Sequence, residues 1–356
     1  MKIGLIYSVY DSERYLRESL ESWLNLKNNS QHEINIAASD GIWEKYQEIG
    51  LDEIHDKSVD ILLESNVDFF YKNRSPYVIS EEESRSTLLR FLNYQNCDLL
   101  WMVDGDEIFT TQDILNIIEY IESNPQVECF RVNYKNFTIR KPLFLNDFVK
   151  ATIYRGNIRG GLTKFIFDND AVYADGAVPD TLNTHLIPRS VAFPKHYTWL
   201  EDDDRIPKKI QHQEHKYIWS GQKGSRCQYR MDGDKLKFND KFWENRGLQF
   251  PVLRKEGSCY SHLFELNFNR KENQIDITKI QEKLFVSVKV YSITDSTFIY
   301  ETNMKLEQYV NYWIKPSLDR IFDQEDFEGF RVEVIKRGNI NTPDELIHEE
   351  FLYLKV

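Results

Sequence analysis

The chain has 356 residues, and its 57 Asp and Glu outnumber its 45 Lys and Arg, which gives a formal net charge of −12 at pH 7. This balance argues against a dedicated nucleic-acid-binding protein, because such proteins usually present a basic surface to phosphates. Hydrophobic residues make up 41% of the chain and aromatic residues 14%. A composition of this kind excludes a disordered protein, and the length fits two domains better than one.

Every apolar run is shorter than the roughly 20 residues that a membrane-spanning helix needs. Charged residues follow the first apolar residues too closely for a secretory signal peptide. The cysteines form no CxxC pair, which favours reduced thiols; they are Cys97, Cys129, Cys227 and Cys259. We therefore expect a cytoplasmic protein with no transmembrane segment.

Short apolar runs alternate with helix-like segments over the first third of the chain. The runs typical of strands lie at 2–9, 33–38, 67–71, 99–103 and 127–134. Apolar residues at helical spacing lie between them, in segments predicted to begin after Ser12, at Ser80 and before Ile114. Because parallel strands need crossover connections, this alternation predicts an α/β fold with a mostly parallel sheet.

The pattern weakens after about Gly156 and changes again near residue 275. From there the chain is predicted to form a small C-terminal α+β domain, whose helix would carry Leu306, Val310, Trp313 and Ile314 on one face. This region has no cluster of Asp or His that would suggest chemistry, so we expect it to serve acceptor recognition or assembly. The predicted parts are a catalytic domain at 1–225, a connecting segment at 226–274 and an accessory domain at 275–356.

The most informative motif is Asp104-Gly105-Asp106, which directly follows the apolar run at 99–103. Open α/β sheets bind ligands at the carboxyl ends of their parallel strands. Carboxylates buried there need compensation, which a divalent cation supplies. Mg²⁺ and Mn²⁺ prefer oxygen ligands and often combine one or two carboxylates with substrate phosphates. The motif alone would fit a structural acidic loop, but the preceding strand and the ordered α/β pattern favour a metal site.

The first 220 or so residues resemble the family 2 glycosyltransferases of the GT-A fold, which is Rossmann-like. The segment from Ile6 to Glu13 resembles the opening strand and nucleotide loop of that family, and Ser39-Asp40-Gly41 resembles its second acidic loop. Residues 98–109 resemble its strand and DxD motif, in the branch that reads Asp-x-Asp-Glu. Two departures are Ser8 in place of the usual proline and Ser39 in place of the first acid of the second loop.

The resemblance implies a set of ligand-binding residues. Nucleotide contacts are expected from Tyr10, Asp11 and Asp40, and a diphosphate contact from Arg85, with Arg90 as a competing candidate. Asp104 and Asp106 would bind Mn²⁺ or Mg²⁺, and Asp104 would also contact the donor. The pair His196-Tyr197 resembles a histidine–aromatic pair of the family, so His196 is expected to bind the metal or the diphosphate.

An inverting transferase needs a carboxylate that takes the proton of the acceptor hydroxyl. The segment Val178-Pro179-Asp180 resembles the acid-bearing segment of this branch, so Asp180 is the first candidate for the base, with Asp175 and Glu201 as alternatives. A further group of basic residues is interpreted as a solvated face, with closure over a diphosphate or an anionic acceptor as the other reading: Arg205, Lys208, Lys209, Lys216, Lys223 and Arg226.

The sequence thus predicts a metal-dependent glycosyltransferase that moves a sugar, with inversion, from a nucleotide-diphosphate donor such as a UDP-sugar to a hydroxyl acceptor. The acceptor is left open among a glycan, a lipid-linked sugar, a protein and a modified nucleic-acid base. One alternative is a metal-dependent nucleotidyltransferase, which the absence of glycine between Ser8 and Glu13 disfavours. The other is a non-catalytic protein that binds a sugar or a partner.

Overall fold

The computed structural model divides the chain into two compact units. The first comprises residues 1–136, 146–199 and 203–222, and the second comprises residues 137–145, 200–202 and 223–356. The structure describes residues 1–40, 56–72, 81–139, 141, 143–156, 183–200, 202–211, 227–239, 254–255, 264–269, 274–279, 284–294, 298–306, 311–314, 329–336, 343 and 345–353.

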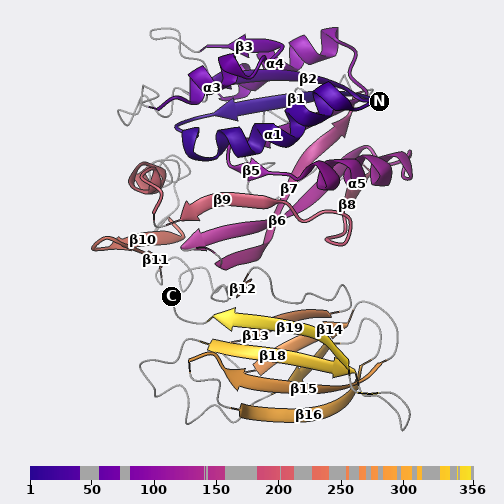
Figure 1. The fold of residues 1–356 in the computed structure, drawn as a ribbon, viewed down its shortest axis with the longest axis vertical. Helices are drawn as coiled ribbons and strands as arrows, with labels where there is room; N and C mark the ends of the chain where they lie inside the picture. Colours follow the sequence, from indigo (N-terminus) through magenta and orange to yellow (C-terminus); the bar gives the residue numbers. More distant parts are fainter. Residues whose placement is uncertain are drawn as a thin grey trace. The chain divides into compact units, whose positions relative to one another are not determined.

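The sheet of the first unit begins with four parallel strands in the order β3-β2-β1-β4, of which the first three are labelled in Figure 1. Their bounds are β1 Lys2–Val9, β2 Glu33–Asp40, β3 Phe69–Tyr71 and β4 Leu99–Asp104. The predicted strands lie at these places, and β2 extends two residues beyond its predicted end. The α/β fold class with a Rossmann-like parallel half-sheet is therefore confirmed.

Beyond β4 the sheet is mixed. Its order continues as β7-β6-β9-β5, and β8 pairs in parallel with β6. β7 is antiparallel to β4, and β5 is antiparallel to β9, so the mostly parallel expectation describes the first half of the sheet. The bounds are β5 Glu107–Ile108, β6 Cys129–Ile139, β7 Leu143–Arg155, β8 Thr184–Leu186 and β9 Lys195–Leu200.

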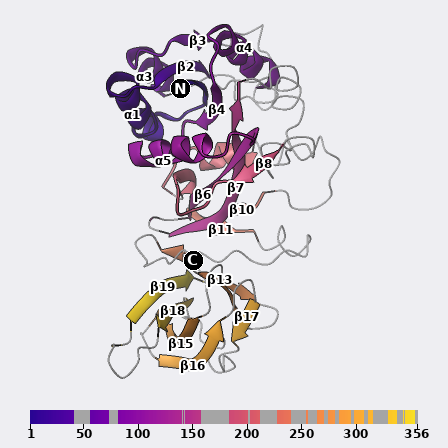
Figure 2. The same ribbon diagram turned by 90° about the vertical axis from the view of Figure 1, so that its right-hand side faces the viewer.

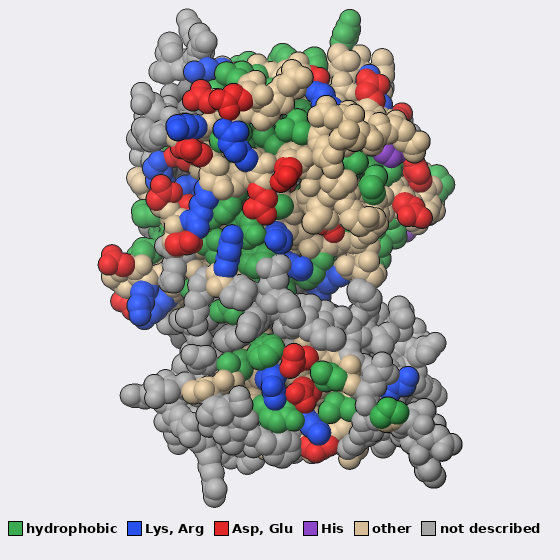
Figure 3. Space-filling model, in the orientation of Figure 1, with side chains coloured by type: hydrophobic (Ala, Val, Ile, Leu, Met, Phe, Trp, Pro, Cys, Tyr) green, Lys and Arg blue, Asp and Glu red, His purple; other side chains and the backbone are tan. Residues whose placement is uncertain are grey.

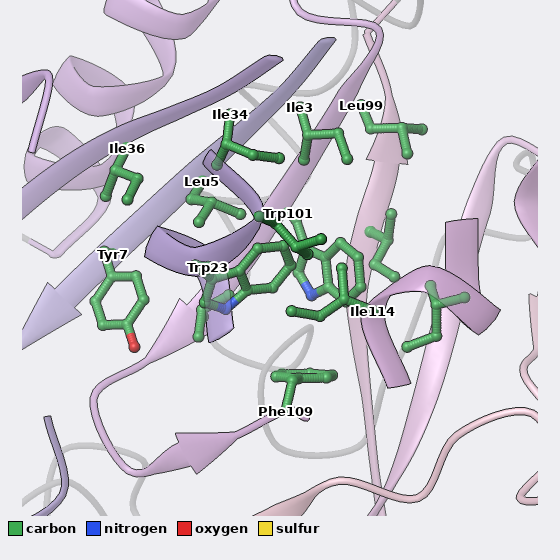
Figure 4. Close-up of a cluster of buried hydrophobic side chains, with 14 of the residues drawn as sticks. Ile3, Leu5, Tyr7, Trp23, Ile34, Ile36, Leu99, Trp101, Phe109 and Ile114 are labelled. Carbon is green, nitrogen blue, oxygen red and sulfur yellow. The ribbon is translucent and has the colours of Figure 1, made fainter. Parts of the chain in front are cut away.

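Helices cover both faces of the parallel strands (Figure 2). On one face α1, α3 and α5 pack against a cluster in which Trp23 meets Trp101 edge-on, with ring centroids 4.7 Å apart (Figure 4). On the other face α4 packs Leu88, Leu89 and Leu92 against the sheet. The helix bounds are α1 Glu13–Asn29, α3 Ser58–Glu64, α4 Glu81–Tyr94 and α5 Thr111–Glu122. Among the described helices, none is long and apolar enough to span a membrane.

The helix starts differ in detail from expectation. Ser12 precedes α1, but its hydroxyl donates to the carbonyl oxygen of Tyr10 at 3.1 Å and makes no cap bond. The start of α5 is instead closed by a capping box in which Thr110 and Asp113 bind each other's backbone N–H.

Three buried cysteines in the described residues, Cys97, Cys129 and Cys227, are thiols rather than disulfides.

The described part of the second unit consists of strands. One sheet has the order β13-β14-β17 and another the order β16-β15-β18-β19, beside the pair β10-β11. The bounds are β10 Tyr229–Asp232, β11 Lys235–Phe238, β12 Arg254–Lys255, β13 Phe264–Asn269, β14 Gln274–Lys279, β15 Leu284–Ser292, β16 Phe298–Leu306, β17 Asn311–Ile314, β18 Gly329–Lys336 and β19 Glu345–Tyr353.

The strands predicted near 284–291, 297–300 and 330–335 are present, but the helix predicted through Trp313 and Ile314 is wrong there. Residues 311–314 form β17, in which Ile314 pairs with Ile275 of β14, and Tyr312 pairs with Ile277. The spacing from Leu306 to Ile314 is compatible with a helix, but Tyr312 and Ile314 are two residues apart, as on one face of a strand. Pairing with β14 favours the strand.

Candidate functional site

The carboxyl ends of three neighbouring parallel strands bring the predicted acidic residues to one edge of the sheet. Ser8 of β1 lies opposite Asp104 of β4, and Val9 of β1 lies opposite Asp40 of β2. Asp11 follows directly after β1, and both it and Asp40 are buried. Three predicted ligand-binding residues are therefore close in the fold although 93 positions, from 11 to 104, separate the outermost two.

Asp104 is flanked by two cations from different elements. Lys150 Nζ of β7 donates to Asp104 Oδ2 at 2.6 Å, and Arg85 Nη2 of α4 lies 3.6 Å from Asp104 Oδ1. Burial opposes ionisation of this carboxyl, but Lys150 and Arg85 hold the pKa of Asp104 below its usual value. Arg85 is only 5% exposed, whereas Arg90 is exposed, so Arg85 is the arginine of α4 that belongs to this site.

Lys150 also binds Glu107, and sequence reasoning gave neither residue a role. Lys150 Nζ donates to Glu107 Oε1 at 2.7 Å, and the Tyr134 hydroxyl donates to Glu107 Oε2 at 3.3 Å. Burial, together with the nearby Asp104 charge, raises the pKa of Glu107 to about 7. The only sequence signal for Lys150 was a lysine between the apolar residues Val149 and Ala151 in a strand-like run. Continuing the β4–β7 register, in which Trp101 faces Ile153, places Lys150 level with Asp104.

Asp106 is held by a second set of partners, on the segment that follows β9. Lys209 Nζ donates to Asp106 Oδ2 at 3.3 Å, and Arg205 Nη2 lies 3.6 Å from the same oxygen. Although burial alone would raise it, these two positive charges keep the pKa of Asp106 far below its usual value. Arg205 is buried and also paired with Asp203 at 2.7 Å. The interpretation of this basic group as a solvated face is therefore wrong for Arg205 and Lys209.

His196 lies beside Asp106 because β9 pairs with β5. Its Nε2 is 3.6 Å from Asp106 Oδ1, and His196 faces Glu107 in the strand register. Burial lowers the pKa of His196 to about 4, so the imidazole is neutral at neutral pH. A neutral imidazole can coordinate a metal, whereas a protonated one cannot. The Thr198 hydroxyl lies 2.5 Å from the same nitrogen.

Gly105 fits a close contact within the protein. A Cβ atom at this position would lie 2.9 Å from Ser12 Cβ and 3.0 Å from Ser12 Oγ. The Tyr197 N–H donates to the carbonyl oxygen of Asp106 at 3.0 Å, which fastens the motif to β9. The acidic loop is thus fixed between the start of α1 and β9, so both carboxylates have defined positions.

The loop after β1 contributes a third acid–base contact. The carboxylate of Asp11 pairs with Lys208, and Asp11 has a left-handed backbone with a φ of 44°, which Asp tolerates better than most residues. Tyr10 is half-buried beside it. Other predicted residues lie outside the described part of the chain, namely Gly41, Asp175, Asp180, Glu201, Lys216, Lys223 and Arg226.

The side chains of this site could bind a divalent cation only if the substrate supplied further ligands. Asp104 and Asp106 offer hard carboxylate oxygens, and His196 offers a neutral nitrogen. Among the described residues, however, no three His, Cys, Asp or Glu side chains converge as a complete metal cage. Two carboxylates with few protein ligands are typical of a metal that takes its other ligands from substrate phosphates.

No protein-family model matches the chain, and no curated protein matches it. Several solved structures are similar. S. aureus TarS 1–349 is 14% identical over 60% of this chain and 65% of that chain, with a TM-score of 0.35; this segment was also solved with UDP-GlcNAc. Full S. aureus TarS is 10% identical over 100% of this chain and 86% of that chain, also with a TM-score of 0.35.

Another similar structure is glucosyl-3-phosphoglycerate synthase from Mycobacterium tuberculosis, in complex with Mn²⁺, UDP-glucose and phosphoglyceric acid. It is 12% identical over 38% of this chain and 44% of that chain, with a TM-score of 0.27. The match covers less than two thirds of the length of both the TarS segment and the synthase. At such low identities and TM-scores, these likenesses assign neither a substrate nor residue roles to this chain.

Proposed function

We propose that this chain is a glycosyltransferase that moves a sugar from a UDP-sugar to a hydroxyl acceptor with inversion. Asp104 and Asp106 would hold Mn²⁺ or Mg²⁺, with His196 as a further ligand, and Tyr10, Asp11, Asp40 and Arg85 would contact the donor. When bound, the metal would neutralise the charge of the departing diphosphate. Residues of the chain would position the donor and take the proton of the acceptor hydroxyl.

The observation that carries this proposal is the charge balance around the two carboxylates. In the ion pairs around the motif, four acidic side chains face four basic ones: Asp104, Asp106, Glu107 and Asp203 against Arg85, Lys150, Arg205 and Lys209. A divalent cation alone would add uncompensated positive charge to this buried cluster, and a diphosphate alone would add negative charge. A metal–diphosphate pair nearly cancels and therefore fits best.

The balance predicts that metal and nucleotide bind cooperatively. We expect Mn²⁺ to strengthen UDP binding by about tenfold or more, a coupling free energy of at least 1.4 kcal/mol. By linkage UDP must strengthen Mn²⁺ binding by the same factor. Calorimetric titration of the full chain with UDP, in EDTA and in Mn²⁺, measures the first factor, and titration with Mn²⁺, with and without UDP, measures the second. Equal UDP affinity in both buffers would contradict the metal assignment.

The catalytic base is proposed to be Asp180. Replacing it by asparagine is expected to leave donor binding unchanged and to slow sugar transfer by about 10²-fold or more, because a carboxamide cannot accept the hydroxyl proton. Transfer is measured as UDP release from a panel of UDP-sugars with candidate acceptors. A rate within a few-fold of wild type would instead direct the search to Asp175 or Glu201.

Two related assignments belong to the same proposal. Residues 275–356 are proposed to recognise the acceptor or to mediate assembly. Release of UDP rather than pyrophosphate distinguishes a sugar transferase from the alternative nucleotidyltransferase. Binding of a UDP-sugar without turnover in the presence of acceptors would instead favour the non-catalytic binding protein.

A further inference from the structure

The first unit contains a cavity of about 430 Å³ that none of the residues assigned to the carboxylate site lines. Three basic residues from two segments contribute to its wall: Lys135 of β6, and Arg189 and Lys195 of the stretch that leads into β9. In a chain whose net charge is −12, a cluster of three basic residues suggests a binding site for an anion. Small-molecule pockets commonly have volumes of roughly 300–1,000 Å³, so the cavity can hold a compact ligand.

The cavity and the carboxylate site use opposite faces of the same strands. In β6 the Tyr134 hydroxyl binds Glu107, whereas the next residue, Lys135, lines the cavity. In β9 His196 is beside Asp106, whereas the preceding Lys195 lines the cavity. Because neighbouring strand residues point to opposite faces, the strands separate the two sites. A ligand in the cavity would therefore be additional to the donor.

The cations of the cavity are held in place by an aromatic ring and by the backbone. Lys135 Nζ and Arg189 Cζ each lie 5.4 Å from the centroid of the Phe193 ring, within the range of cation–π attraction. The Lys135 N–H donates to the carbonyl oxygen of Pro194 at 2.8 Å. Asn116 of α5 donates to the carbonyl oxygen of Val191 at 3.0 Å. The loop that carries Arg189 and Phe193 is thus fixed at both sides.

Two acidic residues also line the cavity, but the net charge of its wall remains positive. The Asp113 carboxylate accepts bonds from the Thr110 N–H at 2.9 Å and the Thr110 hydroxyl at 2.7 Å, so it serves the capping box of α5. Glu18 is an exposed residue of α1. Three cations against these two acids give the wall a net positive charge, with one of the acids already engaged.

We propose that this cavity binds a sugar phosphate. The phosphate would be held by Lys135, Arg189 and Lys195, since guanidinium and ammonium groups form strong charge-assisted hydrogen bonds to phosphate oxygens. The volume leaves room for a sugar ring beside the phosphate. The site is separate from the proposed donor site, so it does not depend on the transferase assignment.

The test uses the full chain and glucose 6-phosphate as the probe, with glucose and inorganic phosphate as comparison ligands in calorimetric titrations. We expect glucose 6-phosphate to bind more tightly than phosphate and glucose not to bind. Arg189→Gln and Lys135→Met should each weaken glucose 6-phosphate binding by about tenfold, the usual effect of losing one hydrogen bond to a charged group. The exposed Lys72 gives the matched control, and Lys72→Gln should stay within about twofold of wild type.

A second control separates the two sites. Lys209→Met changes the carboxylate site and should leave glucose 6-phosphate binding within about twofold of wild type, since Lys209 does not line the cavity. Loss of binding in Lys209→Met with retention in Arg189→Gln would overturn the proposal, as would the absence of any binding by the wild type. Equal binding of phosphate and glucose 6-phosphate would overturn its sugar component.

Discussion

Replacing Asp106 by alanine is expected to abolish the effect of Mn²⁺ on donor binding. In the wild type Mn²⁺ should strengthen UDP binding by about tenfold or more, and in Asp106→Ala this ratio should fall to about one. The reason is that the variant keeps Lys209 and Arg205, which lie 3.3 and 3.6 Å from the lost carboxylate, so metal-free binding of a diphosphate has no cause to weaken. The ratio of UDP affinities in Mn²⁺ and in EDTA, from calorimetry, is the measurement.

The control for this variant is Asp204→Ala. Asp204 is exposed and close in sequence to Arg205, so the substitution changes the net charge equally without touching the motif. Its Mn²⁺ ratio should equal that of the wild type. An unchanged ratio in Asp106→Ala, with the far-ultraviolet circular dichroism of the native fold, would show that Asp106 does not bind the metal.

Among the substitutions proposed here, Lys150→Met should cause the largest loss in the free energy of unfolding. Its side chain is almost completely buried and contacts both Asp104 and Glu107, so removing it leaves the buried Glu107 and the half-buried Asp104 without their shared cation. Breaking a buried ion pair in this way typically costs about 3–5 kcal/mol of the free energy of unfolding. Urea denaturation followed by tryptophan fluorescence measures the change. Lys72→Met, at an exposed position, should change the free energy by less than about 0.5 kcal/mol.

A double-mutant cycle identifies the cause of that loss. Glu107→Gln removes one of the two carboxylates, so Glu107→Gln/Lys150→Met should recover part of the stability lost in Lys150→Met. We expect an interaction free energy of about 1–3 kcal/mol between the two positions. Strict additivity of the two single changes would show that Lys150 acts through packing of its aliphatic chain rather than through its charge.

The local elements of the first unit could be predicted because each is specified by a short stretch of sequence. The run at 99–103 is apolar throughout and is followed by the acids Asp104, Asp106 and Glu107, so both the buried strand β4 and the place of Asp104 follow from it. The partners of those acids could not be predicted, because they depend on pairing between distant strands. Lys150 reaches Asp104 through the antiparallel β4–β7 pair, and no pattern within β7 fixes that register.

The basic residues after β9 show a different limit. A stretch rich in charge usually indicates a solvated surface, and that reading ignores the tertiary partners that bury Arg205 against Asp203 and Asp106. On the face shown in Figure 3, Lys and Arg side chains are interspersed with Asp and Glu. The composition therefore excluded a broad basic surface, but it could not predict which basic residues are buried.

The contact between Trp23 and Trp101 makes the core of the first unit optically observable. The two indole rings lie 4.7 Å apart with an interplanar angle of 82°, and Trp101 is three residues from Asp104 in β4. Their strong far-ultraviolet transition dipoles are close enough to couple, which should give a circular dichroism couplet in that region. That spectral feature would report on the packing beneath the acidic motif in every variant, without a label.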